Sequence, residues 1–369
     1  MAYYYVDPSK TAGGDSGGGG GADPTVEAEW TDAYLTLQQA ADAAAAGDTV
    51  FCRGTEVLAA TCDFDTNTGS WATPIKFIGL NASGVDDGTP YVLDGNSAAV
   101  NCIKIIEKYF HFFKNFELKN STIDGVANSG GFSTYWNVYS HHHGSDGFYH
   151  TAVNESCIFF QCCALNNVAH GFNGWPADSF FAFCDSSLNG STGYAQNRGL
   201  RGLIYKCIAY DNSSYGAYGL ARYQHVIGCT FDDNGVKNLN FAVSNDMPHI
   251  AFNRLTNSPI GLAHTNAASI IYDIYNFING NTTDISASGG YFNAGGETTG
   301  TQGYVAQGSG NLNLDATATL RKIKLLVGGT ADGVNTSFET AGQIPEESGG
   351  GGGTKSRFGE TLGVKRGIL

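Results

Sequence analysis

Short apolar segments separated by polar corners recur along the middle of the chain. Residues 157–165, 180–184, 202–210, 225–231 and 249–255 are rich in aromatic and β-branched side chains and are too short for typical helices. Small polar residues and glycines follow each of them. The pattern therefore predicts many short strands joined by tight turns.

Three residue types recur in one register along these segments. The cysteines at 22- to 23-residue intervals are Cys162, Cys184, Cys207 and Cys229. Five residues after each comes an asparagine, at Asn167, Asn189, Asn212 and Asn234, and the series continues to Asn257. Four residues after the asparagine there is often a glycine, at Gly171, Gly193, Gly216 and Gly261. Such a register indicates a structural repeat.

A period of 22 to 23 residues with several short strands is what one coil of a parallel β-solenoid needs. Strands in successive coils lie about 4.8 Å apart, so equivalent residues stack in columns. We expect an asparagine ladder at one corner, in which each side-chain amide bonds the next. The cysteines are expected to be buried, unreactive side chains in the core.

The N-terminal sequence adds a second feature. The segment TLQQAADAAAAGDTVFCRGTEV, residues 36–57, has a helical pattern that runs through Gly47 and Asp48 into a strand. The buried face of this helix is expected to contain Leu35, Leu37, Ala40, Ala41 and Ala44. Together with the repeat, the segment resembles the right-handed parallel β-helix proteins of the pectate-lyase-like superfamily.

The resemblance extends from about residue 3 to about residue 295 and implies an all-β, single-stranded, right-handed parallel β-helix (solenoid). An N-terminal helical cap and a divergent C-terminal segment would complete it, with about ten to twelve coils. The expected parts are a Gly-rich arm over 1–29, a capping helix over 30–48, the β-helix over 49–296, a C-terminal cap region over 297–348, and a Gly-rich linker with a basic tail over 349–369.

Charge limits the classes of function. The chain has 20 Lys and Arg against 34 Asp and Glu, a formal net charge of −14. This disfavours nucleic acid as a partner, because a duplex binder needs a basic face. No export signal or long apolar run is found, so we expect synthesis in the cytoplasm, free thiols and no membrane association.

Enzymes of the resembled superfamily cut acidic polysaccharides along one face of the solenoid. A lyase of this kind implies an arginine beside the substrate carboxylate and calcium held by acids. The candidate catalytic residues are Arg198, Arg201, Arg222, His225, Asp232 and Asp233. The two aspartates precede the corner residue Asn234, so a solvated turn explains them as well. The ordered motifs of polygalacturonases are not matched, and we assign none of their roles.

Aromatic residues near turns are candidates for stacking on sugar rings. They are Trp136, Tyr139, Trp175, Tyr194 and Tyr218. The alternative is structural, because the interiors of β-helices are also filled with stacked aromatic rings.

Three consecutive histidines stand in SHHHGSDGF, residues 140–148. Asn120 and Asn167 are 47 residues apart, or two coils, so the corner between them is expected at His142 or His143. A histidine there can replace the ladder amide as donor and acceptor. The alternative is a metal site formed by His141, His143 and Asp146.

These features lead us to expect a non-enzymatic virion structural protein of a bacteriophage, made in the host cytoplasm and without a cofactor. It would be a capsid-surface decoration or a tail-associated receptor- or glycan-binding protein. The expected partners are other virion proteins through the tail 354–369, a host surface glycan, and two further copies in a homotrimer. The alternatives are a polysaccharide lyase or glycoside hydrolase, with calcium in the lyase case, and an extracellular cell-surface adhesin.

Overall fold

The computed structural model describes residues 1–10, 20–98, 100–151, 156–174, 178–195, 202–220, 224–241, 249–264, 270–274, 276–287 and 290–293. The chain forms two compact units, the first being Met1–Ser179 and the second beginning at Phe180. Both are built from short parallel strands, and the fold is an all-β parallel solenoid of about nine turns, in which the described residues form helix only near the N-terminus. The predicted fold class is confirmed.

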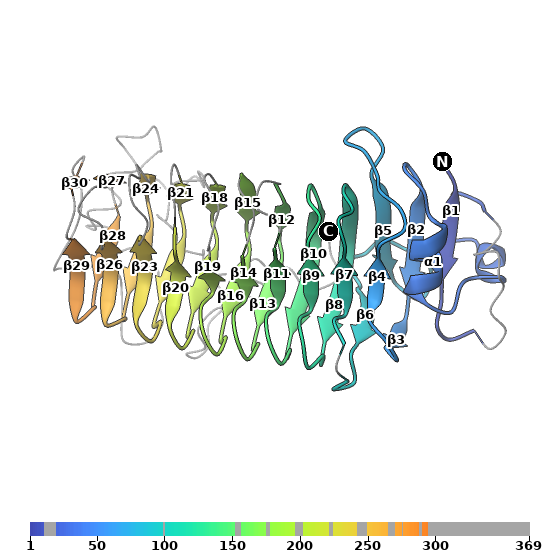
Figure 1. Ribbon diagram of the computed structural model, residues 1–369, viewed down its shortest axis with the longest axis horizontal. Helices are drawn as coiled ribbons and strands as arrows, with labels where there is room; N and C mark the ends of the chain where they lie inside the picture. Colours follow the sequence, from blue (N-terminus) through green and yellow to red (C-terminus); the bar gives the residue numbers. More distant parts are fainter. Residues whose placement is uncertain are drawn as a thin grey trace, which may run out of the picture. The chain divides into compact units, whose positions relative to one another are not determined.

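Each coil contributes one strand to each of three rows, which we call ribbons 1, 2 and 3 (Figure 1). In the first unit, ribbon 1 contains β1 (Tyr3–Val6), β2 (Thr49–Arg53), β5 (Ile75–Leu80), the first halves of β8 (His111–Lys119) and β10 (Thr134–His141), and β12 (Ile158–Phe160). Ribbon 2 contains β3 (Thr55–Val57), β6 (Tyr91–Asp94), the second halves of β8 and β10, and β13 (Cys163–Leu165). Ribbon 3 contains β4 (Cys62–Phe64), β7 (Ile103–Ile105), β9 (Val126–Asn128), β11 (Phe148–His150) and β14 (Phe172–Asn173).

The second unit repeats this order. Ribbon 1 contains β15 (Ser179–Ala182), β18 (Gly202–Tyr205), β21 (Gln224–Ile227), β24 (His249–Ala251), β27 (Ile270–Ile274) and β30 (Gly290–Asn293). Ribbon 2 contains β16 (Asp185–Ser187), β19 (Ile208–Tyr210), β22 (Thr230–Asp232), β25 (Arg254–Thr256) and β28 (Phe277–Asn279). Ribbon 3 contains β17 (Tyr194–Ala195), β20 (Tyr215–Tyr218), β23 (Lys237–Phe241), β26 (Ile260–His264) and β29 (Thr283–Ala287).

Inward- and outward-pointing side chains alternate along each strand, and the inward ones fill the interior with stacked rings. Within ribbon 1 of the first unit, Phe77 stacks on Phe113, Phe113 on Tyr135, and Tyr135 on Phe159, with ring centroids 5.1 to 5.6 Å apart. All four side chains are buried. Because neighbours in a strand point to opposite faces, the residues between them point outward.

The predicted asparagine ladder is present at the corner between ribbons 2 and 3. In the second unit, Asn189 donates to Asn212 Oδ1 at 3.0 Å, and Asn212 donates to Asn234 Oδ1 at 2.9 Å. The next members are Ser258, whose Oγ accepts from Asn234 N, and Asn281, whose Oδ1 accepts from Ser258 N.

The prediction that Asn257 continues this ladder was wrong. Asn257 is exposed, has a left-handed backbone (φ 58°), and donates to Asp232 on the outside of the coil. The coil from Asn234 to Ser258 has 24 residues, one more than the spacing of 23 that predicted Asn257, so the inward position falls to Ser258. A hydroxyl can make the same bonds to its neighbours as the amide does.

The cysteine column forms a second ladder at the corner between ribbons 1 and 2. The backbone N–H of Cys184 donates to Cys207 Sγ, and that of Cys207 to Cys229 Sγ, both at 3.4 Å. Cys229 N donates in turn to Asn253 Oδ1 at 2.8 Å, so asparagine takes over from cysteine in the same column. All nine cysteines are free, as expected.

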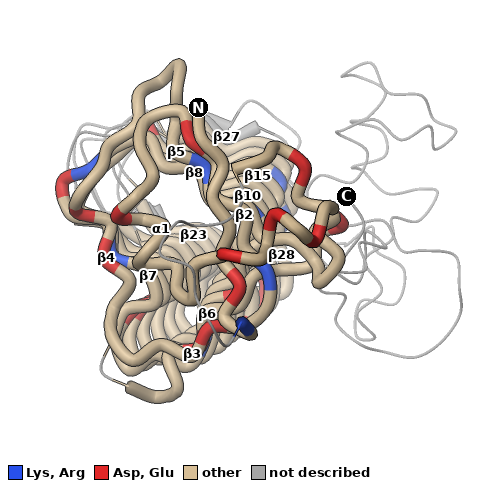
Figure 2. The backbone as a smooth tube through the Cα atoms, turned by 90° about the vertical axis from the view of Figure 1, so that its right-hand side faces the viewer, with Lys and Arg blue, Asp and Glu red and all other residues tan. Residues whose placement is uncertain are grey.

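The N-terminal cap begins with α1 (Leu37–Ala43), whose N-cap Thr36 forms a capping box with Gln39. Helix α1 contacts β4 and β1, and Figure 2 looks onto this end of the unit. Leu37, Ala40, Ala41 and Ala44 are buried as predicted, whereas Leu35 is only partly buried.

The prediction of a Gly-rich arm over 1–29 was wrong for residues 1–10 and 20–29, the part of this segment that the structure describes, because they pack on the first coil. Strand β1 pairs in parallel with β2, and Tyr5 and Val6 are fully buried. A 3-10 helix follows at η1 (Glu27–Trp30), and the helix of the predicted 30–48 segment is confined to α1. The cause is the apolar run YYYV, which supplies a strand that covers the edge of β2.

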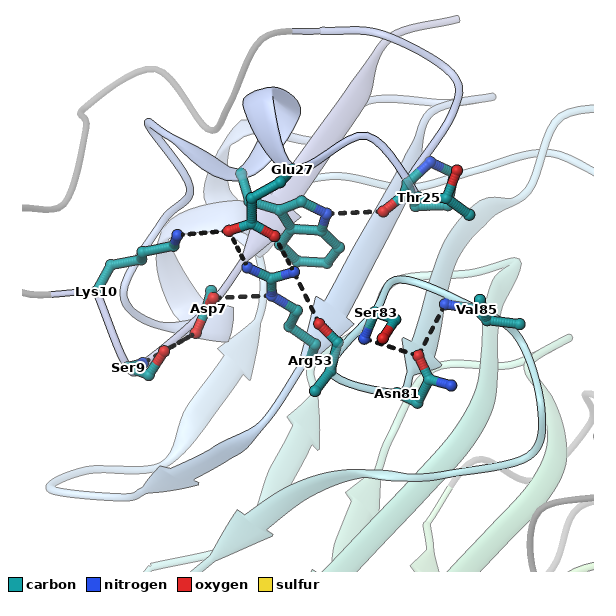
Figure 3. A network of polar contacts seen from close by, with 12 residues as sticks. Asp7, Ser9, Lys10, Thr25, Glu27, Arg53, Asn81, Ser83 and Val85 are labelled. Carbon is teal, nitrogen blue, oxygen red and sulfur yellow. Dashed lines mark hydrogen bonds and ion pairs between the residues drawn. The ribbon is translucent and has the colours of Figure 1, made fainter.

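Arg53 fastens this N-terminal segment to the first coil (Figure 3). Its side chain, 7% exposed, donates to Asp7 Oδ2 and, through two nitrogens, to both oxygens of Glu27, each at 2.8 Å. The guanidinium also lies 4.0 Å from the ring centroid of the buried Trp30. A planar cation that makes paired bonds and stacks on a ring holds its neighbours in one geometry.

The coil number is smaller than predicted because the early coils are long. Thr49 pairs with Lys76, 27 residues on, and Ile75 pairs with His111, 36 residues on. Later coils have the predicted length, as in the pairing of Gly202 with Gln224. The predicted cap region 297–348 and tail 349–369 lie outside the described residues. In the part that is described, no helix is long and apolar enough to cross a membrane.

Candidate functional site

The outer face of ribbon 1 in the first unit places two lysines beside aromatic rings. Strand pairing aligns Lys76 with Phe112, and aligns Lys114 with Trp136 and Trp136 with Phe160. These five residues, which we call the lysine–aromatic face, all lie on positions that alternate with the buried ring stack. Trp136 is 38% exposed, and the other four are partly exposed.

Contacts among these side chains fix their orientation. The Lys114 ammonium lies 5.6 Å from the Trp136 ring centroid, and Trp136 Nε1 donates to Gln161 Oε1 at 3.2 Å. The Trp136 and Phe160 rings meet edge to face at 5.0 Å. Lys114 also forms an ion pair with Asp86, which stands on the loop between β5 and β6. The face is thus an ordered surface with a cation held against an indole.

The histidine triplet lies one ribbon further on and is divided between surface and core. His143 is buried in the ladder position, where its Nδ1 accepts from Ser121 and its Nε2 donates to the Leu118 carbonyl at 3.1 Å. Its backbone N–H donates to Asn167 Oδ1. Burial lowers the pKa of His143 to about 3. The prediction of a corner histidine that replaces the ladder amide is confirmed at His143.

His142 is exposed, whereas His141 is only 9% exposed and takes no part in the ladder. His141 Nε2 is 3.2 Å from Glu117 Oε1, and its Nδ1 is 2.6 Å from Nδ1 of the exposed His142. Tyr139 stacks on the His141 ring with centroids 4.1 Å apart. Partial burial, followed by the charge of His141, lowers the pKa of His142.

The predicted metal ligands do not come together. His143 uses both ring nitrogens within the ladder, while Asp146 accepts from Asn173 at 2.7 Å and from the His170 backbone at 2.8 Å. His141 faces Glu117 instead. No group of three or more His, Cys, Asp or Glu residues that could hold a metal is found among the described residues.

The remaining binding candidates lie in different places. Tyr194 is fully buried, and its hydroxyl donates to the Cys184 carbonyl, so it is a core residue and not a surface ring. Tyr218 is partly exposed on ribbon 3 beside Tyr215, with centroids 4.8 Å apart. Trp175 lies outside the described residues.

Three of the catalytic candidates, Arg198, Arg201 and Arg222, also lie outside the described residues. In sequence they belong to the connections that lead from ribbon 3 into β18 and β21. His225 is described and points outward from β21, where its ring lies 5.1 Å from that of His249 on the next coil. Partial burial, followed by the charge of His249, lowers the pKa of His225.

The paired aspartates end a strand of ribbon 2. Asp232 accepts from Thr256 Oγ1 at 2.7 Å and lies 3.8 Å from the Arg254 guanidinium. Asp233 is exposed at the corner with φ 51°. These contacts give both residues a structural role at the turn.

Sequence reasoning missed Lys76 and Lys114. The available signal was a lysine at an outward position of an otherwise apolar strand, as in IKFIGL (75–80) and HFFKNFELK (111–119). A charged side chain is tolerated there only if it points to solvent. Without the strand register, nothing aligned these lysines with Phe112 and Trp136.

Comparisons with known proteins agree with the fold. No protein-family model matches the chain, and no curated protein sequence matches it. Among solved structures, the pectate lyase Pel9A superposes with a TM-score of 0.61 at 17% sequence identity, over 94% of this chain and 88% of that one. A rhamnogalacturonan lyase gives a TM-score of 0.48 at 14% identity, over 76% of this chain and 74% of that one. The A-module of the Azotobacter vinelandii mannuronan C-5 epimerase AlgE6 gives 0.46 at 14% identity, over 69% and 91%. The structural neighbours are thus right-handed parallel β-helix proteins, and at this identity the likeness establishes the fold.

Proposed function

We propose that the protein binds an acidic polysaccharide along the outer face of ribbon 1. The observation that carries the proposal is the lysine–aromatic face, on which two lysines of successive coils, Lys76 and Lys114, each lie beside an aromatic ring of the next coil. Lysines attract the carboxylates of such a polymer, and aromatic rings stack on the faces of its sugars. Coils repeat every 4.8 Å or so, which is close to the length of one pyranose residue in an extended chain.

Charge supports an acidic ligand at this face rather than elsewhere. The chain carries a net charge of −14, and acidic residues are more frequent than basic ones at the end of the molecule seen in Figure 2. A polyanion is repelled by most of such a surface, so it binds where cations are concentrated. Lys76 and Lys114 provide that concentration on one face.

Binding of polygalacturonate and alginate oligomers, measured by calorimetry, tests the proposal. We expect Lys114→Gln and Lys76→Gln to weaken binding about tenfold each, and added salt to weaken the wild type. Asp86→Asn should instead strengthen binding, because it frees Lys114 from its ion pair. Lys104→Gln on ribbon 3 is the matched control. Equal affinities for all four variants and the wild type would exclude this face as the binding site.

Cleavage of a uronic-acid polymer is a second and separate proposal, carried by His225 in the second unit. Its lowered pKa keeps the imidazole neutral at pH 7, as a base must be to accept a proton. In β-elimination, the base takes the proton next to the uronate carboxylate, a C=C bond forms, the glycosidic C–O bond breaks, and the departing sugar oxygen takes up a proton from water. Arg222, three residues earlier in sequence, would pair with that carboxylate. No described cluster fits calcium, so no step is assigned to it.

An ultraviolet assay for unsaturated product tests the cleavage. We expect product from at least one uronic-acid polymer, loss of more than about 90% of the rate in His225→Gln and Arg222→Gln, and no loss in Asp233→Asn. Assays with added calcium and with a chelator belong to the same series. Absence of unsaturated product from every polymer tested would exclude a lyase.

The placement of the protein on a virion is a separate proposal that rests on the sequence. A decoration or receptor-binding protein can also hold a glycan, so this role is compatible with the binding face. Mass spectrometry of purified particles would detect the protein if it is a virion component. Removal of residues 354–369 should then abolish its incorporation, and unchanged incorporation would exclude the tail as the docking segment.

A further inference from the structure

A second group of aromatic rings lies beside the start of ribbon 1 in the first unit. Trp71 stands in the turn between β4 and β5 and is 78% exposed. Its ring meets the Phe110 ring edge to face at 6.3 Å, and Phe110 lies parallel to Phe132 of the next coil at 5.0 Å. We call Trp71, Phe110 and Phe132 the aromatic platform.

The backbone beneath the platform is in an unfavourable conformation. Phe110 and Phe132 have φ values of 61° and 54°, in the left-handed region that bulky side chains rarely adopt. Glycine or asparagine would occupy these turns at lower cost. Corners elsewhere in the solenoid, such as those at Phe183 and Phe252, share this conformation, so it marks the sharp turn that places Phe110 and Phe132 side by side.

Hydrogen bonds hold the turn that carries Trp71 against the next coil. Gly69 N donates to the Tyr109 carbonyl at 2.9 Å, and Tyr109 N donates to Thr68 Oγ1 at 2.9 Å. Within the turn, the hydroxyls of Ser70 and Thr73 are 2.7 Å apart and exposed. The indole is thus presented on an anchored turn, with hydroxyl groups at its side that can bond to a ligand.

Charge at the platform differs from charge at the lysine–aromatic face. The nearest charged residues in sequence are Glu107 and Lys108, which are of opposite sign, and no described lysine or arginine lies over any of the three rings. An exposed aromatic patch without a cation favours a ligand that is flat, carries hydroxyl groups and has no charge.

We propose that the aromatic platform binds an uncharged pyranose residue. The inference builds on the proposed binding of an acidic polysaccharide, and it specifies the polymer as a heteropolysaccharide that carries neutral sugars as well as uronates. Phe110 lies one residue before the strand that bears Phe112, and Phe132 lies two residues before the strand that bears Trp136, so the platform borders the lysine–aromatic face. A neutral residue or branch would stack on the platform while uronates lie over the lysines.

Binding of neutral hexasaccharides of glucose, galactose, xylose and rhamnose, followed by tryptophan fluorescence and calorimetry, tests the platform. We expect at least one to bind the wild type, and Trp71→Ala to weaken its binding about tenfold, the effect of losing one stacked ring. Trp71→Phe keeps a ring and should retain most of the affinity. Because Trp71 is exposed, Trp71→Ala should unfold at the wild-type temperature, which separates lost binding from lost structure.

The same series separates the two proposals. Binding of a neutral hexamer that is lost in Trp71→Ala, without binding of polygalacturonate, would support the platform and overturn the acidic ligand. Polygalacturonate binding that depends on Lys114, with no neutral hexamer bound or with Trp71→Ala equal to the wild type, would overturn the platform alone.

Discussion

His143 shows how one residue type can take the structural place of another. In a ladder of amides, it accepts from Ser121 through Nδ1 and donates to the Leu118 carbonyl through Nε2, as a side-chain amide would do with its oxygen and nitrogen. Gly125 beneath it leaves room for the larger ring, because a Cβ there would lie 2.6 Å from His143 Nε2. The neutral imidazole is therefore a structural group.

Replacement of His143 by asparagine should be tolerated. His143→Asn introduces the residue that the next coil has at this position, Asn167, and should change the free energy of unfolding by no more than about 1 kcal/mol. His143→Leu leaves the bonds of Ser121 and Leu118 unmade and should cost about 1–3 kcal/mol. Denaturant unfolding of the two variants compares them directly, and equal losses would argue against the ladder role.

At the scale of the element, the glycine column is explained by close packing. A glycine in a turn usually serves to adopt a left-handed backbone, but that is not its role here. Gly193 and Gly216 have no left-handed backbone. They are required because the chain passes close to the ladder: a Cβ on Gly216 would lie 2.6 Å from the Asn238 carbonyl oxygen and 2.9 Å from Asn234 Nδ2. The glycines thus allow the asparagine ladder to pack against ribbon 3.

Alanine at Gly216 should therefore destabilise the second unit. The added methyl group meets a backbone oxygen that cannot move freely, and we expect a loss of about 1–3 kcal/mol in the free energy of unfolding. Ser213→Ala, at an exposed position of the same coil, is the control and should have little effect. Thermal unfolding of both variants checks this, and a stable Gly216→Ala would contradict the packing explanation.

The N-terminal segment should detach in acid. The bonds from Arg53 and Lys10 lower the pKa of Glu27 to about 2, so the contribution of this carboxylate is present above its unfolded pKa of about 4.5 and is lost as the pH falls toward 2. Hydrogen exchange of residues 22–30 should accelerate over that range. In Glu27→Gln, exchange should already be fast at pH 7. A wild-type rate in this variant would show that the ion pair between Arg53 and Glu27 does not hold the segment in place.

At the scale of the whole molecule, buried histidines should make the fold sensitive to mild acid. Burial lowers the pKa of His111 to about 4 and of His150 to about 3, as it does for His143. Each stays neutral in the folded state while its unfolded counterpart takes up a proton below about pH 6.5. Stability is therefore full above that pH and declines as the pH falls toward 4, by about 1.4 kcal/mol per pH unit for each histidine.

Replacement of His150 tests this explanation. The ring packs edge to face against Tyr135 and Phe159, so His150→Phe preserves the aromatic contact and removes the proton uptake. Between pH 7 and 4, the variant should take up about one proton fewer on unfolding than the wild type, so its unfolding midpoint should depend less steeply on pH. A slope equal to that of the wild type would assign the acid sensitivity to other groups.

The repeat was predictable because every coil must satisfy the same local constraints. An inward corner position needs a small side chain that bonds the equivalent residue of the preceding and the following coil. This requirement explains why cysteine and asparagine recur at a fixed spacing in the sequence. The same logic located His143 at a corner. It failed at Asn257, where a one-residue lengthening of the coil moved the inward position to Ser258.

The sequence by itself determined the solenoid, its period, its ladders and its N-terminal helix, because these depend on residues whose neighbours are set by a fixed repeat. Only the tertiary structure decided that Tyr194 is buried, that β1 joins the first coil, and that Lys114 lies against Trp136. The burial of Tyr194 and the contact of Lys114 with Trp136 occur in coils of ordinary length, but they depend on which face of a strand points inward and on the pairing of β8 with β10, which spacing along the chain does not show. The alignment of Lys76 with Phe112 crosses an early coil of 36 residues, in which the repeat no longer shows which side chains become neighbours.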